Sequence, residues 1–124
     1  MTLSLSISAA PAARALPRPA AYVVRRMRVT AYCPCRECCG ARACGITASG
    51  ARICNTDGYF VAADPAIAFG TRLSVPGYAL ERAVPVLDRG RRVKTDCVDV
   101  YFADHRTAKR WGVHWLDVKI YNRS

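Results

Sequence analysis

Three aspartates stand at the ends or turns of predicted strands, in the segments VAADPA (Asp64), VLDRG (Asp88) and VDVYF (Asp99). Asp99 is the unusual one, because Val98 and Val100 flank it inside an apolar run. A carboxylate in such a run must be paired, hydrogen-bonded or protonated. Burial raises the pKa of a carboxyl group, and a second carboxylate nearby raises it further. Asp99 therefore has the character of a general acid for glycoside cleavage.

The other two aspartates have simpler interpretations beside the catalytic one. Asp64 precedes Pro65, where a turn-capping role is the better expectation. Asp88 precedes Arg89 and begins a turn, so turn capping and function are equally good interpretations. If the strands carrying Asp88 and Asp99 are neighbours, the two carboxylates could face each other across a cleft. Hydrolysis needs a second carboxylate, and Asp88 is the candidate.

Cysteine is concentrated in one short segment, CPCRECC, and the whole chain has seven cysteines. The spacing of Cys35 and Cys38 fits a zinc knuckle, but no second CxxC follows. Four thiolates could still come from this segment together with Cys44 or Cys54. The alternatives are disulfides in an oxidising compartment and reduced thiols in a core. The candidate metal ligands in the segment are Cys33, Cys35, Cys38 and Cys39.

Histidine and tryptophan give weaker signals. His105 is expected in the first turn of a helix and His114 beyond its end, as surface or capping groups, since no HxxxH spacing links them. Trp111 and Trp115 could stack on sugar rings, but aromatic residues near a helix end are more often part of a core. Cys97 lies two residues before Asp99, so strand alternation places both on one face.

Short strands dominate the predicted structure that must position these side chains. Alternating or β-type runs are separated by Gly, Pro, Asn and Asp. They cover residues 27–32, 59–63, 72–75, 83–87, 98–102 and 117–121. One helix is predicted after Asp104 as N-cap, over HRTAKRW, with Gly112 as its stop. About six short strands and one short helix, without long crossover helices, indicate a mainly β fold, a small closed barrel.

Length and charge limit the classes of protein to consider. The chain has 124 residues, which suffices for one domain. The sequence contains no run of about 18 apolar residues, so it predicts no transmembrane helix. Residues 1–21 lack Asp, Glu and Gly and predict either a disordered leader or a weak signal-like segment, so the domain is expected over 22–124. The net charge of +10 favours anionic partners such as nucleic acid, an anionic membrane surface or a cell-wall polymer.

The stretch from Val29 to Tyr121 resembles the bacterial 3D domain, a family named for three aspartates. The matching blocks run in order along the chain: VTAYCPCRECCG, GITASG, FVAADPAIAFGTRLSVPGY, VPVLDRG, VDVYFADHRTAKRWG and VKIY. The resemblance implies a six-stranded double-psi β-barrel, the fold of the catalytic domain of membrane-bound lytic transglycosylase A and of rare-lipoprotein-A-like proteins. It also implies action on peptidoglycan outside the cytoplasm, although the export signal is weak or missing here.

The resemblance also assigns residues. Asp64, Asp88 and Asp99 match the three family aspartates, and Asp99 matches the acid of the lytic transglycosylase. A TASG block expected beside the cleft is matched by Thr47, Ser49 and Gly50.

The chain departs from the family after Asp88, where a glycine-rich segment is replaced by RGRRVK. These cations are expected to lower the pKa of a nearby acid. Arg89 and Arg91 could instead bind carboxylates of peptidoglycan stem peptides.

The leading hypothesis is therefore a monomeric enzyme that cleaves glycan strands of peptidoglycan through Asp99, as a lytic transglycosylase or a hydrolase. The first alternative is a non-catalytic module that binds cell-wall polysaccharide. A nucleic-acid-binding zinc module, which would need aromatic platforms between basic residues, is disfavoured because the chain has no RNP-like or finger pattern. No cofactor is required for the proposed chemistry, and a structural zinc at the cysteine segment is the only one that the sequence suggests.

Overall fold

The computed structural model describes residues 21–35 and 45–122. Nearly all of the predicted leader, and the cysteines Cys38, Cys39 and Cys44, lie outside this part of the chain. Six strands lie within it, and their bounds are β1 Tyr22–Tyr32, β2 Val61–Ala63, β3 Arg72–Ser74, β4 Val84–Asp88, β5 Cys97–Tyr101 and β6 His114–Tyr121. The same residues contain one α-helix, α3 (His105–Trp111), and two short 3-10 helices, η3 (Ile53–Asn55) and η4 (Ala79–Glu81).

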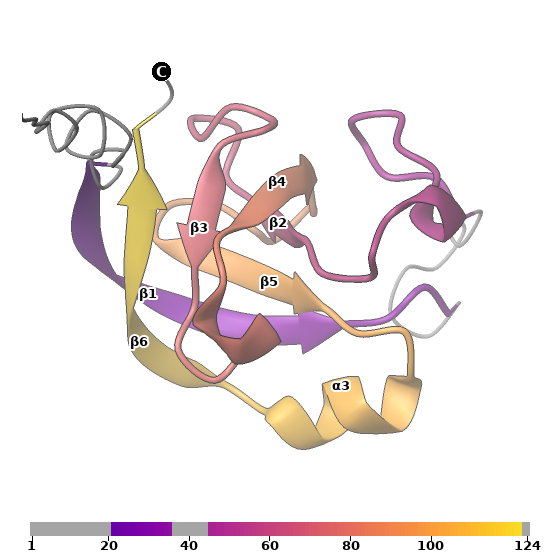
Figure 1. Ribbon diagram of the computed structural model, residues 1–124. Coiled ribbons are helices and arrows are strands. Elements are labelled where there is room, and N and C mark those ends of the chain that lie inside the picture. The colour runs from indigo at the N-terminus through magenta and orange to yellow at the C-terminus, as the bar shows by residue number, and fades with distance from the viewer. Residues whose placement is uncertain (1–20, 36–44, 123–124) are drawn as a thin grey trace, which may run out of the picture.

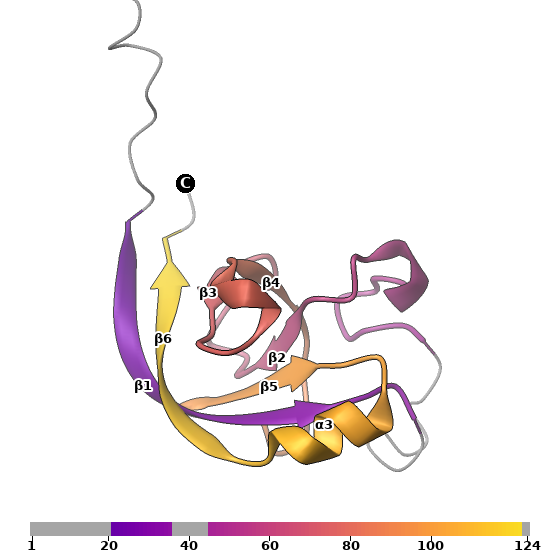
Figure 2. The ribbon, with the colours of Figure 1, turned by 60° about the horizontal axis from the view of Figure 1, so that its bottom comes forward.

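The six strands close into a barrel in the order β1-β5-β2-β4-β3-β6, with β6 pairing back to β1 (Figure 1). Two pairs are parallel, β1 with β5 and β2 with β4, and the remaining pairs are antiparallel. The expected fold class, a small six-stranded double-psi β-barrel with one short helix, is confirmed. Figure 2 shows α3 packed below the barrel, next to the end of β1.

Strand alternation separates two apolar clusters. The first fills the barrel and consists mainly of β-branched and aliphatic side chains, as strands of this kind prefer. Its strand residues include Met27, Val29, Val61, Ala63, Leu73, Val84, Val86, Val98, Val100 and Val118. The second lies on the opposite face of β1, β5 and β2 and consists of Tyr32, Phe60, Ala62, Val93 and Tyr101. Asp99 alternates with Val98 and Val100, so its side chain lies on the face of this second cluster.

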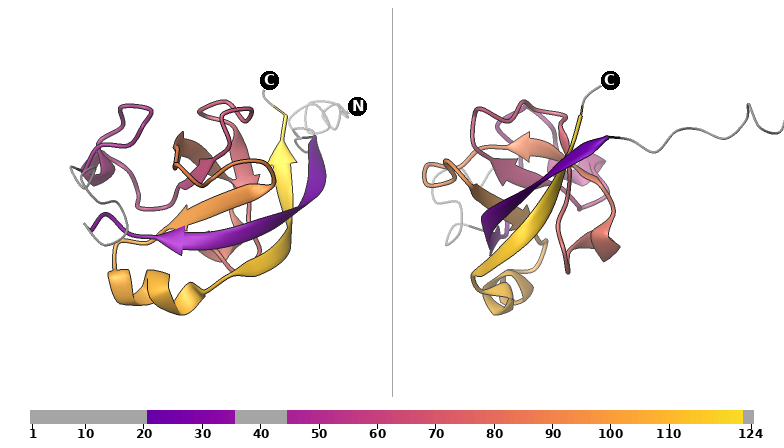
Figure 3. Two further views of the ribbon diagram at one scale, coloured as in Figure 1. Left: turned by 180° about the vertical axis from the view of Figure 1, so that it is seen from behind. Right: turned by 90° about the vertical axis from the view of Figure 1, so that its left-hand side faces the viewer.

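β1 is longer than the sequence indicates, because its first half is stabilised by a distant partner. The alternating pattern predicts a strand from Met27, whereas the ladder with β6 extends from Val29–His114 back to Tyr22–Tyr121. Val23 and Val24 remain exposed in this extension. Both long strands curve together around the barrel when the molecule is seen from behind (Figure 3).

Helix α3 begins and ends where the sequence predicts. The Asp104 side chain accepts a hydrogen bond from the Thr107 N–H at 2.9 Å, as an N-cap does. Gly112 ends the helix with φ 76°, a conformation that favours glycine. Trp111 is partly buried and packs against the core, and its indole N–H donates to the Val29 carbonyl at 3.3 Å. Trp115, in contrast, is exposed on β6.

Tyr78 connects the ends of β2 and β5 from inside the protein. Its hydroxyl lies 2.6 Å from the Tyr101 carbonyl and 3.2 Å from the Phe60 carbonyl, and it accepts from the Phe60 N–H at 3.2 Å. Burial raises the pKa of Tyr78 well above its usual value, so the hydroxyl remains a donor. The Phe60 carbonyl also accepts from the Tyr101 N–H at 3.1 Å, although β2 begins at Val61 rather than at the predicted Tyr59.

Replacing this hydroxyl should destabilise the fold. We expect Tyr78→Phe to lower the free energy of unfolding by about 1–3 kcal/mol, because the buried backbone groups of Phe60 and Tyr101 lose a partner. Urea unfolding followed by circular dichroism measures the change. Tyr59→Phe is the matched control, since Tyr59 is exposed. Equal stability of the two variants would contradict the assigned role.

Candidate functional site

Four residues form a row across adjacent strands, and two of them are acids. Asp99 on β5 pairs with Thr30 on β1 and with Ala62 on β2. Ala62 pairs on its other side with Asp88 on β4. Neighbouring strands lie about 4.8 Å apart, so the Cα atoms of the two aspartates are separated by about 10 Å. The register of β2 with β4 shifts between Val61 and Ala62, and the charge of Asp88 acts on Asp99 although β4 and β5 are not direct neighbours.

The Asp99 carboxyl group is half-buried and has the raised pKa that a general acid needs. Burial is the largest cause, and the negative charge of Asp88 adds to it, so that the pKa rises to about 6. The Thr30 hydroxyl, which donates to Asp99 Oδ1 at 3.0 Å, and the cation of Arg28 act in the opposite direction. The expected effects of burial and of a second carboxylate are thus confirmed.

The expectation that the RGRRVK segment lowers the pKa of this acid is wrong. Arg28 on β1 is the cation that lowers the pKa of Asp99. No cation of the segment from Arg89 to Lys94 is among the groups that shift the pKa of Asp99.

Asp88 accepts hydrogen bonds on both carboxylate oxygens. Oδ2 accepts from the Tyr32 hydroxyl at 2.6 Å, and Oδ1 accepts from the backbone N–H groups of Ala48 at 2.8 Å and Arg89 at 2.9 Å. These donors come from the end of β1, from a separate loop and from the turn after β4. Asp88 therefore organises the surroundings of Asp99 while contributing a negative charge to them.

The TASG block forms a tight turn beside Asp88. The Thr47 side chain is buried, with its hydroxyl 2.9 Å from the Ser49 hydroxyl and accepting from the Ala51 N–H at 3.2 Å. Ser49 is exposed, and its N–H donates to the Leu87 carbonyl at 3.1 Å. Gly50 has φ 88°, which the turn requires and glycine permits. The block thus lies at the end of β4, next to Asp88.

Asp64 has a local role in the structure. Its Oδ1 accepts from the Ala66 N–H at 2.7 Å, and its carbonyl accepts from the Ile67 N–H at 2.8 Å. This is the turn-capping role that the sequence favours for Asp64. The structure therefore brings Asp88 and Asp99 together and places Asp64 in the turn that follows β2.

The two arginines expected to bind substrate differ in their surroundings. The Arg89 guanidinium donates to the carbonyls of Ile67 at 2.8 Å, Asp88 at 3.2 Å and Ala63 at 3.4 Å. It also lies 4.0 Å from the centroid of the Phe69 ring. Arg89 therefore positions the turns after β2 and β4, whereas Arg91 is exposed to solvent.

A second group of reactive side chains lies just beyond the end of β1. Cys33, Cys35 and His105 have their sulfur and ring nitrogen atoms within 4.8 Å of one another. The sequence does not predict that His105 belongs to this group, because a lone histidine in the first turn of a helix is expected to be a surface or capping residue. The only sequence signal for it is the helix N-cap at Asp104, which fixes His105 as the first helical residue.

Comparison with known proteins gives three findings. The model of the 3D domain family matches residues 59–122. The protein YabE of Bacillus subtilis (strain 168), whose name describes cell wall shaping, is 33% identical over 95 residues. These residues are 75% of this chain but only 22% of YabE, so the chain spans about a fifth of that relative. The crystal structure of MltA from E. coli aligns with a TM-score of 0.47 at 21% identity, over 64% of this chain and 28% of MltA.

None of the helices in residues 21–35 and 45–122 has the length and apolar character that spanning a membrane requires.

Proposed function

This chain belongs to the 3D domain family, and on that premise we propose that it cleaves glycan strands of bacterial peptidoglycan outside the cytoplasm. The observation that carries the proposal is the Asp99 carboxyl group, half-buried within a strand with a pKa raised to about 6. Near neutral pH such a group exists in both protonation states, as a general acid that later acts as a base requires. The name of YabE, a relative described by cell wall shaping, supports the choice of substrate.

The reaction uses Asp99 twice. Its proton passes to the glycosidic oxygen between two amino sugars, the bond from this oxygen to the anomeric carbon breaks, and positive charge develops on the ring. The C6 hydroxyl of the same sugar then attacks the anomeric carbon and gives its proton to Asp99. A 1,6-anhydro ring forms and the acid is regenerated without any water being consumed.

The contacts of Asp88 favour this route over hydrolysis. Hydrolysis needs a second carboxylate that activates water. Both Asp88 oxygens already accept hydrogen bonds from Tyr32, Ala48 and Arg89. We therefore assign Asp88 an electrostatic role, in which its charge raises the pKa of Asp99 and stabilises the positive sugar ring.

Residues around Asp88 would bind the substrate. The exposed Ser49 hydroxyl lies in the turn that donates to Asp88 and could contact a sugar. Thr47 and Gly50 shape that turn. Arg91 is exposed and offers a cation to the carboxylates of stem peptides, and the net charge of +10 favours an anionic polymer in general.

A digest of purified sacculi tests the proposal. We expect the protein to release fragments that end in a 1,6-anhydro sugar, which mass spectrometry distinguishes from hydrolysis products by the mass of one water. Products one water heavier would favour hydrolysis and return Asp88 to the role of a base. If the protein releases nothing but pellets with the sacculi, the alternative of a non-catalytic wall-binding module replaces the enzyme.

A further inference from the structure

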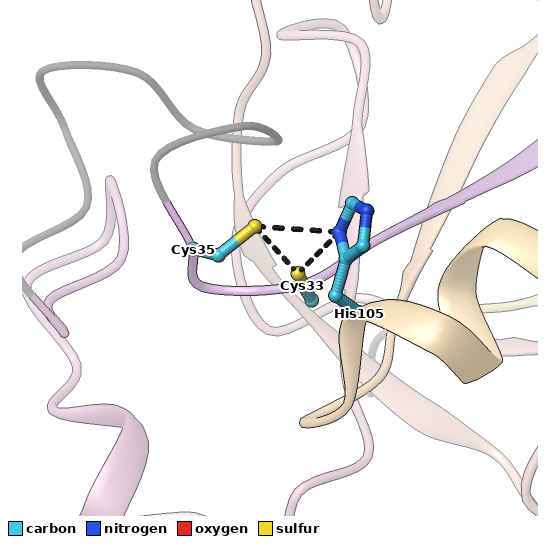
Figure 4. Close-up of side chains that lie close together, drawn as sticks. All are labelled: Cys33, Cys35 and His105. Atoms are coloured by element: carbon cyan, nitrogen blue, oxygen red, sulfur yellow. Dashed lines mark hydrogen bonds between the residues drawn. The ribbon is translucent and has the colours of Figure 1, made fainter.

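Three side chains with soft or borderline ligand atoms converge from two elements (Figure 4). Cys33 and Cys35 directly follow β1, and His105 is the first residue of α3. The Nδ1 atom of His105 lies 3.3 Å from the Cys33 sulfur and 3.4 Å from the Cys35 sulfur, and the two sulfurs are 3.0 Å apart. Cys33 is only 1% exposed, and the other two are half-buried.

The proposed glycan chemistry makes no use of this group. Cys33 lies three residues beyond Thr30, just after the end of β1, which corresponds to about 10 Å along an extended chain. Thr30 is the residue that contacts Asp99. The two thiols and the imidazole therefore lie too far from Asp99 to take part in the proposed cleavage.

We propose that Cys33, Cys35 and His105 bind a zinc ion. Thiolate and imidazole are the ligands that zinc takes in proteins, at about 2.3 Å for sulfur and about 2.0 Å for nitrogen. Around a tetrahedral ion these lengths place sulfur and nitrogen about 3.5 Å apart and two sulfurs about 3.8 Å apart. The observed sulfur–nitrogen distances of 3.3 and 3.4 Å are close to this, and the sulfurs need to separate by less than 1 Å.

The position of the ion indicates a structural role. It ties the end of β1 to the start of α3. The end of β1 is also joined to the end of β5, because the Phe102 N–H donates to the Tyr32 carbonyl at 2.9 Å. Tyr32 immediately precedes Cys33, and its hydroxyl holds Asp88. Zinc would thus fix the ends of the two parallel strands, β1 and β5, that carry Thr30 and Asp99.

Binding involves proton release and no redox change. Each thiol gives its proton to solvent and forms a sulfur–zinc bond, while the neutral imidazole donates its Nδ1 lone pair. The competing arrangement, a Cys33–Cys35 disulfide, requires the loss of two electrons and two protons to an oxidant. The intact mass of the protein separates the two, because a disulfide makes it two hydrogens lighter.

The experiment uses the full chain, reduced and freed of metal with a chelator, and then titrated with zinc alone. We expect one zinc per chain by elemental analysis, and a sulfur-to-metal charge-transfer band when cobalt(II) replaces zinc. A competition titration against a chromophoric chelator should show that His105→Ala and Cys35→Ser each weaken zinc binding by at least about 100-fold.

Matched controls come from the same chain. His114→Ala and Cys54→Ser alter an exposed histidine and an exposed cysteine that lie outside the group, and both variants should retain full zinc affinity. Circular dichroism of every variant shows whether it is folded, and thermal unfolding of the unaltered protein should shift to higher temperature with zinc. The proposal is overturned if the reduced protein binds no zinc, if His105→Ala binds it as tightly as the parent, or if the purified chain carries a reducible Cys33–Cys35 disulfide.

Discussion

Asp99→Asn should abolish most of the release of glycan fragments while leaving the fold intact. An amide has the size of the carboxyl group and its oxygen can still accept from Thr30, but it has no proton to give to the glycosidic oxygen. Losing a general acid and base costs about 100-fold to 10,000-fold in rate. Initial rates of fragment release from sacculi, measured for parent and variant at pH 6, give the comparison directly.

The control for this variant removes a carboxylate elsewhere. Asp117 on β6 is exposed and forms an ion pair with Arg26 at 3.2 Å. Such pairs contribute about 0–1 kcal/mol to stability, so Asp117→Asn should retain the parent rate. An Asp99→Asn protein that still cleaves at more than a tenth of the parent rate would remove Asp99 from the mechanism.

The substitution Asp99→Asn, which should lower activity, should raise the free energy of unfolding at neutral pH. The pKa of Asp99 is raised in the folded protein from 3.8 to about 6, so the fold is most favoured when this group is protonated. The parent loses that contribution as the pH rises from about 4 to about 6, and above this range Asp99→Asn should be more stable by on the order of 1–3 kcal/mol. Urea unfolding at pH 4 and at pH 7 resolves the difference. A catalytic group kept at the expense of stability behaves in this way.

Most of the helices and strands could be predicted because their ends and their faces depend on residues close together in the sequence. The helix is fixed by Asp104 and Gly112 at its ends. The strands are fixed by alternation between the barrel interior and the other face, and five of them were expected within about three residues of their observed starts. The extension of β1 to Tyr22 was not predictable, because its pairing with Tyr121 joins residues at opposite ends of the domain.

The site was predictable only in part, for the same reason. Asp99 can be recognised in the sequence because it stands between two valines, whereas its hydrogen bond from Thr30 depends on the pairing of β1 with β5. The distance to Asp88 depends instead on β2 lying between β4 and β5. His105 meets Cys33 because β1 and β5 are parallel, so that both strands end on the same side of the barrel. No spacing along the chain encodes a contact between residues so far apart in sequence.

The pH dependence of cleavage provides the second large effect. If protonated Asp99 starts the reaction, the rate should fall tenfold for each pH unit above about 6, since only the protonated fraction is active. At pH 8 the rate should be about 100-fold below its acidic plateau. Rates of fragment release measured from pH 5 to pH 9 in buffers of equal ionic strength define this limb.

Thr30→Val shows whether the limb belongs to Asp99. The Thr30 hydroxyl donates to the ionised carboxylate and so lowers the pKa of Asp99. Valine has nearly the same shape without the donor, so the pKa should rise and the falling limb should move to higher pH. At pH 8 the variant should then lose less than 100-fold relative to its own plateau. Thr95→Val, at an exposed site, should leave the profile unchanged. If the falling limb stays at the same pH in Thr30→Val, it reports the ionisation of a group other than Asp99, because loss of the Thr30 donor must change the pKa of the carboxyl group that it contacts.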